Sequence, residues 1–152
     1  MIAIDKGDSN ANIIESGNDT LDGSSGDDTL DGWTGADILT GDGDLNDYDR
    51  GGSTGTNTFI LRSGDGGNAI TDADTITDFR NGTDVLGLDG GLQYSDLTIA
   101  QGTADNANDT IISITWTAEY PAIVKEISAS DLNGFDIIPI EWIFWLDKLS
   151  HC

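Results

Sequence analysis

The chain has 152 residues and a formal net charge of −22, with 28 acidic side chains against 6 basic ones. Nucleic acids and anionic membrane surfaces both select positive charge, so this composition argues against either partner. It favours metal cations as partners or, through self-repulsion, a disordered chain. Abundant glycine and aspartate disfavour helices and favour turns, which predicts a small helical content.

Targeting features are few. The N-terminal stretch 1–12 lacks a long apolar region, so we expect no cleaved secretory signal. No apolar run approaches the roughly 20 residues of a membrane span. Cys152 is the single cysteine, which excludes an internal disulfide and a thiolate metal cluster.

A nine-residue repeat dominates the first sixty residues. Three good copies are Ile14–Asp22, Gly23–Asp31 and Gly32–Thr40, each with glycine fourth, aspartate sixth and leucine eighth. A degenerate copy starts at Gly41, and after a two-residue slip a further copy starts at Gly52. The fourth, sixth and eighth residues of these five copies are Gly17, Asp19, Leu21; Gly26, Asp28, Leu30; Gly35, Asp37, Leu39; Asp44, Asn46, Tyr48; and Gly55, Asn57, Phe59.

The residue types give this period a physical meaning. Six residues rich in glycine and aspartate form a turn, and three more form a short strand with one inward apolar side chain. Two units make one coil, so Asp19 and Asp37 stack on one edge, while Asp28 and Asn46 stack on the other. Carboxylates about 4.8 Å apart repel, and a cation between them removes the repulsion. Oxygen ligands without histidine or thiolate point to calcium.

This pattern resembles the nonapeptide of the repeats-in-toxin (RTX), or hemolysin-type calcium-binding, proteins. The resemblance implies an all-β fold with a short right-handed parallel β-roll over residues 1–61 and calcium in its turns. It places side-chain ligands at the sixth residues and carbonyl ligands at glycines of the turns. The metal-site residues expected from it are Asp19, Asp28, Asp37, Asn46, Asn57, Gly17, Gly26, Gly35, Gly23, Gly32 and Gly41.

The chain departs from the family pattern at the second residue of each unit. Glu15, Ser24 and Trp33 replace glycine there, at about 1–2 kcal/mol each if the backbone is left-handed. Asn46 and Asn57 are uncharged, so their sites should be weaker. We expect two good sites, or three, with affinities near the weak extracellular end, roughly 10⁻⁴–10⁻³ M. The alternative is a metal-free solenoid, although turns alone do not require stacked acids.

Residues 62–140 are expected to form an antiparallel β region that caps the roll. Two short strands flank the Asn81-Gly82 turn, and three alternating strands follow within 92–127. One helical turn is compatible with 128–135. The stretch is similar to the region that follows the repeats in many RTX proteins, and 135–140 looks like the end of an uncleaved type I secretion signal.

Residues 141–152 form an aromatic tail unlike the rest of the chain. A buried last strand, an oligomer contact or read-through from an altered reading frame would each account for it. If export needs a terminal signal, this tail counts against the expected extracellular location.

Other motifs do not support catalysis. Gly51–Gly55 matches G-x-S-x-G, but the only histidine is His151 in the tail, and HExxH does not occur. Asp42–Asp47 has acids at calcium-loop spacing, but Asp47 replaces the glycine of an EF-hand. We therefore expect a protein that is not an enzyme.

The function predicted from the sequence is calcium binding that drives folding of a secreted module, with type I secretion machinery as a further partner. One alternative is an adhesive or carbohydrate-contacting surface that uses Trp33, Trp116 or Tyr48 beside calcium. Another is a fragment of a larger RTX protein without a function of its own.

Overall fold

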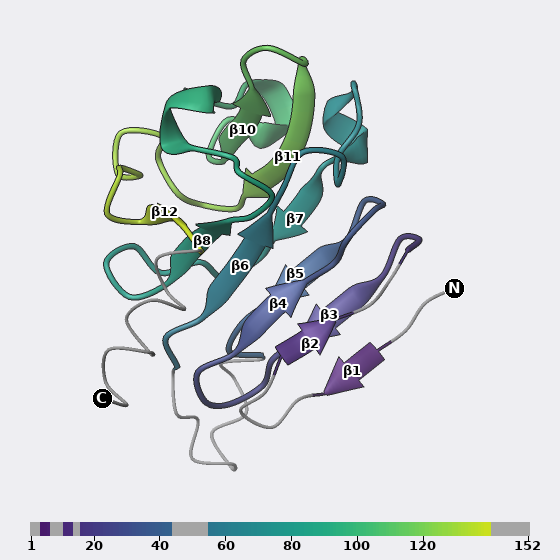
Figure 1. Cartoon of the computed structure of the whole chain (residues 1–152). Helices are drawn as coiled ribbons and strands as arrows, with labels where there is room; N and C mark the ends of the chain where they lie inside the picture. The colour runs from purple at the N-terminus through teal and green to yellow at the C-terminus, as the bar shows by residue number, and fades with distance from the viewer. Residues whose placement is uncertain (1–3, 7–10, 14–15, 44–54, 141–152) are drawn as a thin grey trace, which may run out of the picture.

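The computed structural model describes residues 4–6, 11–13, 16–43 and 55–140. Two stacked β-sheets form its framework (Figure 1). The seven-stranded sheet has the order β1-β3-β5-β7-β11-β10-β9, and the five-stranded sheet has the order β12-β8-β6-β4-β2. The strands are β1 (Ile4–Lys6), β2 (Ala11–Ile13), β3 (Thr20–Asp22), β4 (Thr29–Asp31), β5 (Ile38–Thr40), β6 (Thr58–Leu61), β7 (Asp74–Ile76), β8 (Val85–Leu88), β9 (Leu97–Gln101), β10 (Thr110–Ile114), β11 (Glu119–Val124) and β12 (Ile137–Pro139).

Successive strands of the repeat enter opposite sheets, so the chain winds as a parallel β-roll. Strand β3 pairs with β5 in parallel and places Leu21 beside Leu39, one coil further on. Strand β2 pairs with β4 in the same way in the other sheet. The glycine-rich turns reverse the chain between sheets, because glycine accepts backbone angles that other residues resist. The β-roll fold expected from the sequence is confirmed.

The core lies between the two sheets. The eighth-place side chains Leu21, Leu30, Leu39 and Phe59 are all 0% exposed. They form one cluster with apolar residues of the later strands, including Ile112 and Val124. Burying a leucine stabilises a fold by roughly 1.5–3 kcal/mol, so the roll and the later strands stabilise each other through this shared core.

The parallel roll extends beyond residue 61. Strands β7 and β8 pair in parallel with β5 and β6, and β12 adds to β8 in parallel. Strands β7 and β8 do flank the Asn81-Gly82 turn, but they lie in different sheets, so the antiparallel pairing expected there is wrong. The reason is that Gly82-Thr83-Asp84-Val85-Leu86 repeats the Gly-x-Asp-x-Leu pattern, which directs Leu86 into the core at 0% exposure.

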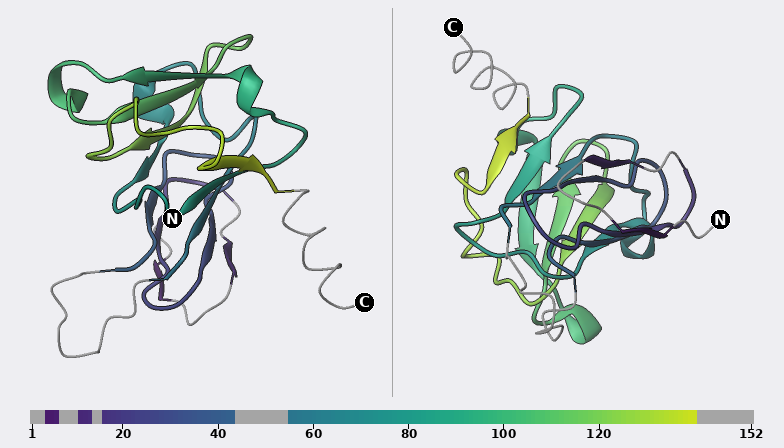
Figure 2. Two further views of the ribbon diagram at one scale, coloured as in Figure 1. Left: turned by 90° about the vertical axis from the view of Figure 1, so that its left-hand side faces the viewer. Right: turned by 90° about the horizontal axis from the view of Figure 1, so that it is seen from below.

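Among the described strands, β9, β10 and β11 pair antiparallel, and one isolated antiparallel bridge joins Gly67 to Tyr120. These strands lie at the end of the molecule opposite the N-terminal coils (Figure 2). Strand β11 also pairs in parallel with β7, which joins this cap to the roll. Short 3₁₀ segments flank the cap: η2 (Ile70–Asp72), η3 (Tyr94–Asp96) and η4 (Ala104–Asn106).

Details of the second half differ from expectation. Ile112 and Ile114 are buried, but Trp116, the next residue in the same alternation, is 63% exposed, because β10 ends at Ile114 and the chain turns there. Residues 128–135 form turns without a helix. In the described residues, no helix is long and apolar enough to cross a membrane. The tail 141–152 lies outside the described residues.

Candidate metal centre

The turns adopt the backbone that the repeat requires. The fourth-place residues Gly17, Gly26 and Gly35 have φ of 123°, 110° and 139°, a region that essentially only glycine occupies. Ser24 and Trp33, in the second place, have φ of 70° and 58°. The left-handed backbone expected at the second place is therefore present. Ser24 and Trp33 are held there in part because their backbone N–H groups donate to Asp22 and Asp31.

Turns of successive coils approach each other closely and bring oxygen atoms together. A Cβ atom added to Gly35 would collide with the carbonyl oxygen of Gly17. A Cβ on Gly23 would lie 2.5 Å from the Gly41 carbonyl oxygen and 2.7 Å from Asp28 Oδ2. Carbonyl and carboxylate oxygens of adjacent coils thus converge on a space that any side chain would fill.

The first turn edge comprises the turns at 16–19, 32–37 and 62–73. Asp37 Oδ1 accepts a hydrogen bond from the Asp19 backbone N–H at 2.7 Å, and Asp74 Oδ1 accepts one from the Asp37 backbone N–H at 2.9 Å. All three aspartates are buried, with 1–3% of their surface exposed. The predicted stack of Asp19 on Asp37 is present, and one oxygen of Asp37 is held by the backbone rather than left to a cation.

The second turn edge comprises the turns at 23–28 and 77–84 and, between them, the described residues 41–43 and 55–57. Asn57 Oδ1 accepts from the Asp28 backbone N–H at 3.0 Å, and Asp84 Oδ1 accepts from the Asn57 backbone N–H at 2.9 Å. The residue that stacks on Asp28 is therefore Asn57, and the predicted pairing with Asn46 is wrong. The chain between β5 and β6 is longer than one repeat turn, which shifts the counting of units. As a result, the parallel pairing of β4 with β6 places Leu30 beside Phe59. Asn46 itself lies outside the described residues.

Burial perturbs the carboxyl groups of the first edge. Among the described residues, Asp37 Oδ2 is buried and has no hydrogen-bond partner. Burial raises the pKa of Asp37, and burial beside Asp37 raises the pKa of Asp74 to about 9. A buried, ionised carboxylate oxygen without a donor is costly, and a hard cation removes that cost.

Carboxylates alone do not form a complete metal site. In the described part of the chain, no three side chains of histidine, cysteine, aspartate or glutamate converge as metal ligands. Backbone carbonyls must supply the remaining oxygens, and the close approach of the turn glycines provides them. Such a mixed set of carboxylate and carbonyl oxygens suits calcium, and the described residues therefore fit this ion.

Most of the predicted site residues lie in these two edges. Asp19 and Asp37 come together on the first edge, and Asp28 and Asn57 on the second. The six predicted glycines all lie in the described turns: Gly17, Gly26, Gly35, Gly23, Gly32 and Gly41.

Sequence reasoning missed Asp74 and Asp84, which continue the two stacks. For Asp84 a signal existed, because Gly82-x-Asp84-x-Leu86 is a further copy of the motif. Asp74 lacks a glycine two residues earlier, so no local pattern marks it. Two arginines of the turns, Arg62 and Arg80, were also missed.

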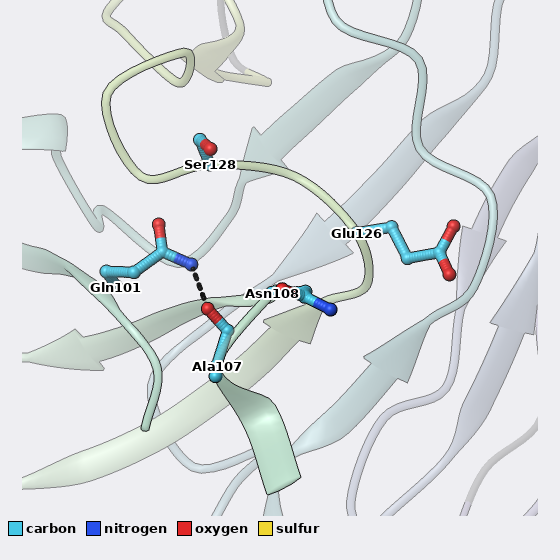
Figure 3. A pocket seen from close by; sticks show the side chains of 5 residues that line it. All are labelled: Gln101, Ala107, Asn108, Glu126 and Ser128. Atoms are coloured by element: carbon cyan, nitrogen blue, oxygen red, sulfur yellow. Dashed lines mark hydrogen bonds between the residues drawn. The ribbon is translucent and has the colours of Figure 1, made fainter. Parts of the chain in front are cut away.

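One shallow pocket lies in the cap, away from the turn edges, and is lined by Gln101, Ala107, Asn108, Glu126 and Ser128 (Figure 3). Both polar atoms of the Gln101 amide already make hydrogen bonds within the protein. Its Nε2 donates to the Ala107 carbonyl at 2.9 Å, and its Oε1 accepts from Ala129 N–H at 3.0 Å. Glu126 extends away from Gln101 (Figure 3). The pocket therefore offers no convergent polar set for a ligand.

The fold and the turns together define a parallel β-roll built from glycine- and aspartate-rich nonapeptides. Residues 13–46 match the family model of the RTX calcium-binding nonapeptide repeat, which comprises four copies. Residues 13–46 therefore carry the RTX calcium-binding repeat, and calcium is the ion of this repeat family. The matched repeat is a binding module rather than a catalytic one.

One solved structure extends the comparison to most of the chain. It is the solution structure of the AlgE6R3 subunit from the Azotobacter vinelandii mannuronan C5-epimerase, with 22% identity and a TM-score of 0.56. The match covers 90% of this chain and 77% of that one, and at this identity it supports the fold alone. The comparison with curated proteins gave no match.

Proposed function

We propose that this chain is a calcium-dependent folding module that acts outside the cell. Its ligands are Asp19 and Asp37 on the first turn edge and Asp28 on the second. Carbonyls of the six turn glycines complete the two sites. Asn57 contributes a neutral oxygen and makes its site weaker. Residues 1–61 would contain the calcium sites, and 62–140 would complete and cap the roll.

The chain's own residues supply both the barrier to folding and the means of removing it. Stacking the coils brings Asp19, Asp37 and Asp74 into one buried column. Like charges in a dry environment oppose this arrangement, and the net charge of −22 adds repulsion over the whole chain. Bound calcium supplies two positive charges and accepts roughly six to eight oxygen ligands. Folding and calcium binding are then one linked equilibrium.

The free energy of calcium binding is large enough to switch the chain between unfolded and folded states. With a dissociation constant of roughly 10⁻⁴–10⁻³ M, about 10 mM calcium stabilises the folded state by about 1.4–2.7 kcal/mol per site. Two sites then contribute about 3–5 kcal/mol, a large part of the stability of a typical small domain. Low calcium inside a cell would leave the repeats unfolded and suited to export, for which the type I secretion machinery is the proposed route.

The observation that carries the proposal is the buried Asp37 carboxylate, whose Oδ2 has no hydrogen-bond partner among the described residues. Its test is far-UV circular dichroism of the full chain, titrated with calcium and separately with magnesium. We expect a calcium-specific gain of β signal in the sub-millimolar to millimolar range. A spectrum already β-rich in chelator and unchanged by calcium would contradict the proposal.

Asp37→Asn is the informative variant, since it removes the charge but keeps the oxygen that accepts from Asp19 N–H. We expect its calcium midpoint to rise by about tenfold, because carboxylate count sets affinity in oxygen sites. Asp105→Asn, at an exposed position in η4, is the matched control and should leave the midpoint unchanged.

A second candidate is a calcium-dependent carbohydrate surface. It is favoured by Trp116, which is 63% exposed at the turn between β10 and β11, an uncommon position for a large aromatic ring. The solved neighbour comes from an epimerase of a polysaccharide, mannuronan. Retention on immobilised mannuronan that needs calcium and is lost in Trp116→Ala would support this function. No retention at any calcium concentration would exclude mannuronan as the ligand.

A further inference from the structure

Positive charge is scarce in this chain, yet two of its six basic residues lie in the later turns of the roll. Arg80 lies on the second turn edge, and Arg62 lies beside the first. Arg62 is the second residue of the nine-residue unit that follows the copy starting at Gly52. Arg80 is the second residue of the unit whose sixth residue is Asp84. In earlier copies, Ser24 and Trp33 occupy this second place. Neither arginine has positive φ, so the later turns have a different construction.

Arg80 occupies the surroundings of a calcium ligand. The Arg80 guanidinium donates a hydrogen bond to the carbonyl oxygen of Gly55, which is the fourth residue of the copy that starts at Gly52. Carbonyls in this place are calcium ligands by the proposal above. The same guanidinium lies 2.9 Å from Asp42 Oδ2, whose side chain is 2% exposed. The sixth residue of the unit is the neutral Asn57, whose Nδ2 also donates to Asp42, at 3.1 Å. Arg80 thus lies beside the copy in which the neutral Asn57 replaces the sixth-place aspartate.

Arg62 neutralises acids from three successive coils. It binds Asp31 with two hydrogen bonds of 2.8 and 2.6 Å, and it lies 3.1 Å from Asp89 and 3.4 Å from Asp65. Its guanidinium also lies 4.5 Å from the centre of the Trp33 ring. Asp31 ends β4, Arg62 follows β6 and Asp89 follows β8, so the side chain bridges the stack in the direction of the roll.

We propose that Arg62 and Arg80 are built-in cations that take the place of calcium in the later coils, so that only the coils of Asp19, Asp28 and Asp37 need the metal. This inference rests on the proposed function. A guanidinium keeps its charge at all physiological pH values, and its position does not depend on ion concentration. The later turns therefore keep two fixed positive charges even in a chelator.

The expected result is a roll with two levels of calcium dependence. Without calcium, β6, β7 and β8 remain paired with the cap through the shared core and the two arginines. Strands β3, β4 and β5 join them only when calcium is present. Calcium then extends an existing roll, which avoids the cost of nucleating a new one.

The test is hydrogen exchange of the full chain, followed by strand, in chelator and along a calcium titration. In chelator, amides of β6–β8 and β10–β11 should be protected and those of β3–β5 should exchange rapidly. Calcium should then protect β3–β5. This measurement needs no variant. If β6–β8 exchange as rapidly as β3–β5 in chelator, the inference is overturned.

Arg62→Gln and Arg80→Gln test the two side chains directly. Each should remove the protection of β6–β8 in chelator and raise the calcium midpoint by about threefold to tenfold, because breaking a buried ion pair leaves a charge for calcium to neutralise. Lys125→Gln is the matched control. It removes the same charge from another buried aspartate, Asp109, which lies in the cap at 2.7 Å from Lys125 Nζ.

The outcomes separate the two proposals. A calcium response in the unmodified chain, with arginine variants that shift the midpoint no more than Lys125→Gln does, overturns the built-in cations and leaves the calcium module intact. An unmodified chain that shows no calcium response at all contradicts the proposed function itself.

Discussion

Replacement of Gly35 by alanine tests the geometry of the turns most directly. Gly35 has φ of 139°, and an alanine Cβ would collide with the Gly17 carbonyl oxygen of the preceding coil. The backbone conformation alone costs a non-glycine residue about 1–3 kcal/mol. Relief of the collision would separate the two turns and weaken two hydrogen bonds between them, Gly17 N–H to Thr34 O at 2.9 Å and Ala36 N–H to Asn18 Oδ1 at 3.0 Å.

At about 0.5–1.5 kcal/mol for each hydrogen bond, the total loss is about 2–6 kcal/mol. Urea denaturation at saturating calcium measures it, and the calcium midpoint should rise in parallel. Gly134→Ala is the matched control, because Gly134 lacks positive φ and a Cβ there meets no atom within 4 Å. A Gly35→Ala protein within 0.5 kcal/mol of the unmodified chain, a margin about the size of one weak hydrogen bond, would refute this account of the turns.

Three further outcomes are expected. Ser24→Gly should stabilise the calcium-bound roll by about 0.5–1 kcal/mol in urea denaturation, because the left-handed cost exceeds the added chain entropy and the lost 3.3 Å contact to Asp22. Leu39→Ala should destabilise it by about 2–5 kcal/mol in the same assay, and a smaller loss would place Leu39 outside the core. Burial raises the pKa of Asp109, but the hydrogen bonds from Lys125 and from the Glu126 backbone N–H, together with the Lys125 charge, outweigh burial and lower the pKa below 3.8. The stabilisation from Asp109 is complete above the pKa of this group in the unfolded state, and it is lost as the pH falls through the lower pKa of the folded state. Thermal unfolding below pH 4 should therefore show a shallower acid loss in Lys125→Met.

The parts of the fold that repeat locally were predictable from the sequence. The spacing of Leu21, Leu30 and Leu39 fixed both the strands and the side chains of the core, and the acids between them marked the turn edges. The prediction failed where the period is interrupted. Once extra residues separate β5 from β6, counting in nines no longer shows which coil rests on which, and Asn57 takes the place expected for Asn46.

Long-range pairing was the other limit. The unit around Asp84 has the local signature of a repeat, but a Gly-containing turn between two short strands is also typical of a hairpin. Only the position of β8 against β6 decides between them. Arg62 and Arg80 gave no signal, because a single arginine in a turn becomes informative only when its partners from neighbouring coils are known.

One type of hydrogen bond recurs at the described junctions between stacked turns of the roll. At each of them, a side-chain oxygen of one coil accepts from the backbone N–H of the corresponding residue in the preceding coil, and in the regular repeat that residue lies 18 positions earlier, as Asp19 does for Asp37. Because neither face of a junction depends on anything beyond its neighbour, a duplicated stretch of 18 residues would add a complete coil and leave both flanking coils with the contacts they already had. A gene for such a protein can change length by copying, without redesign of a core.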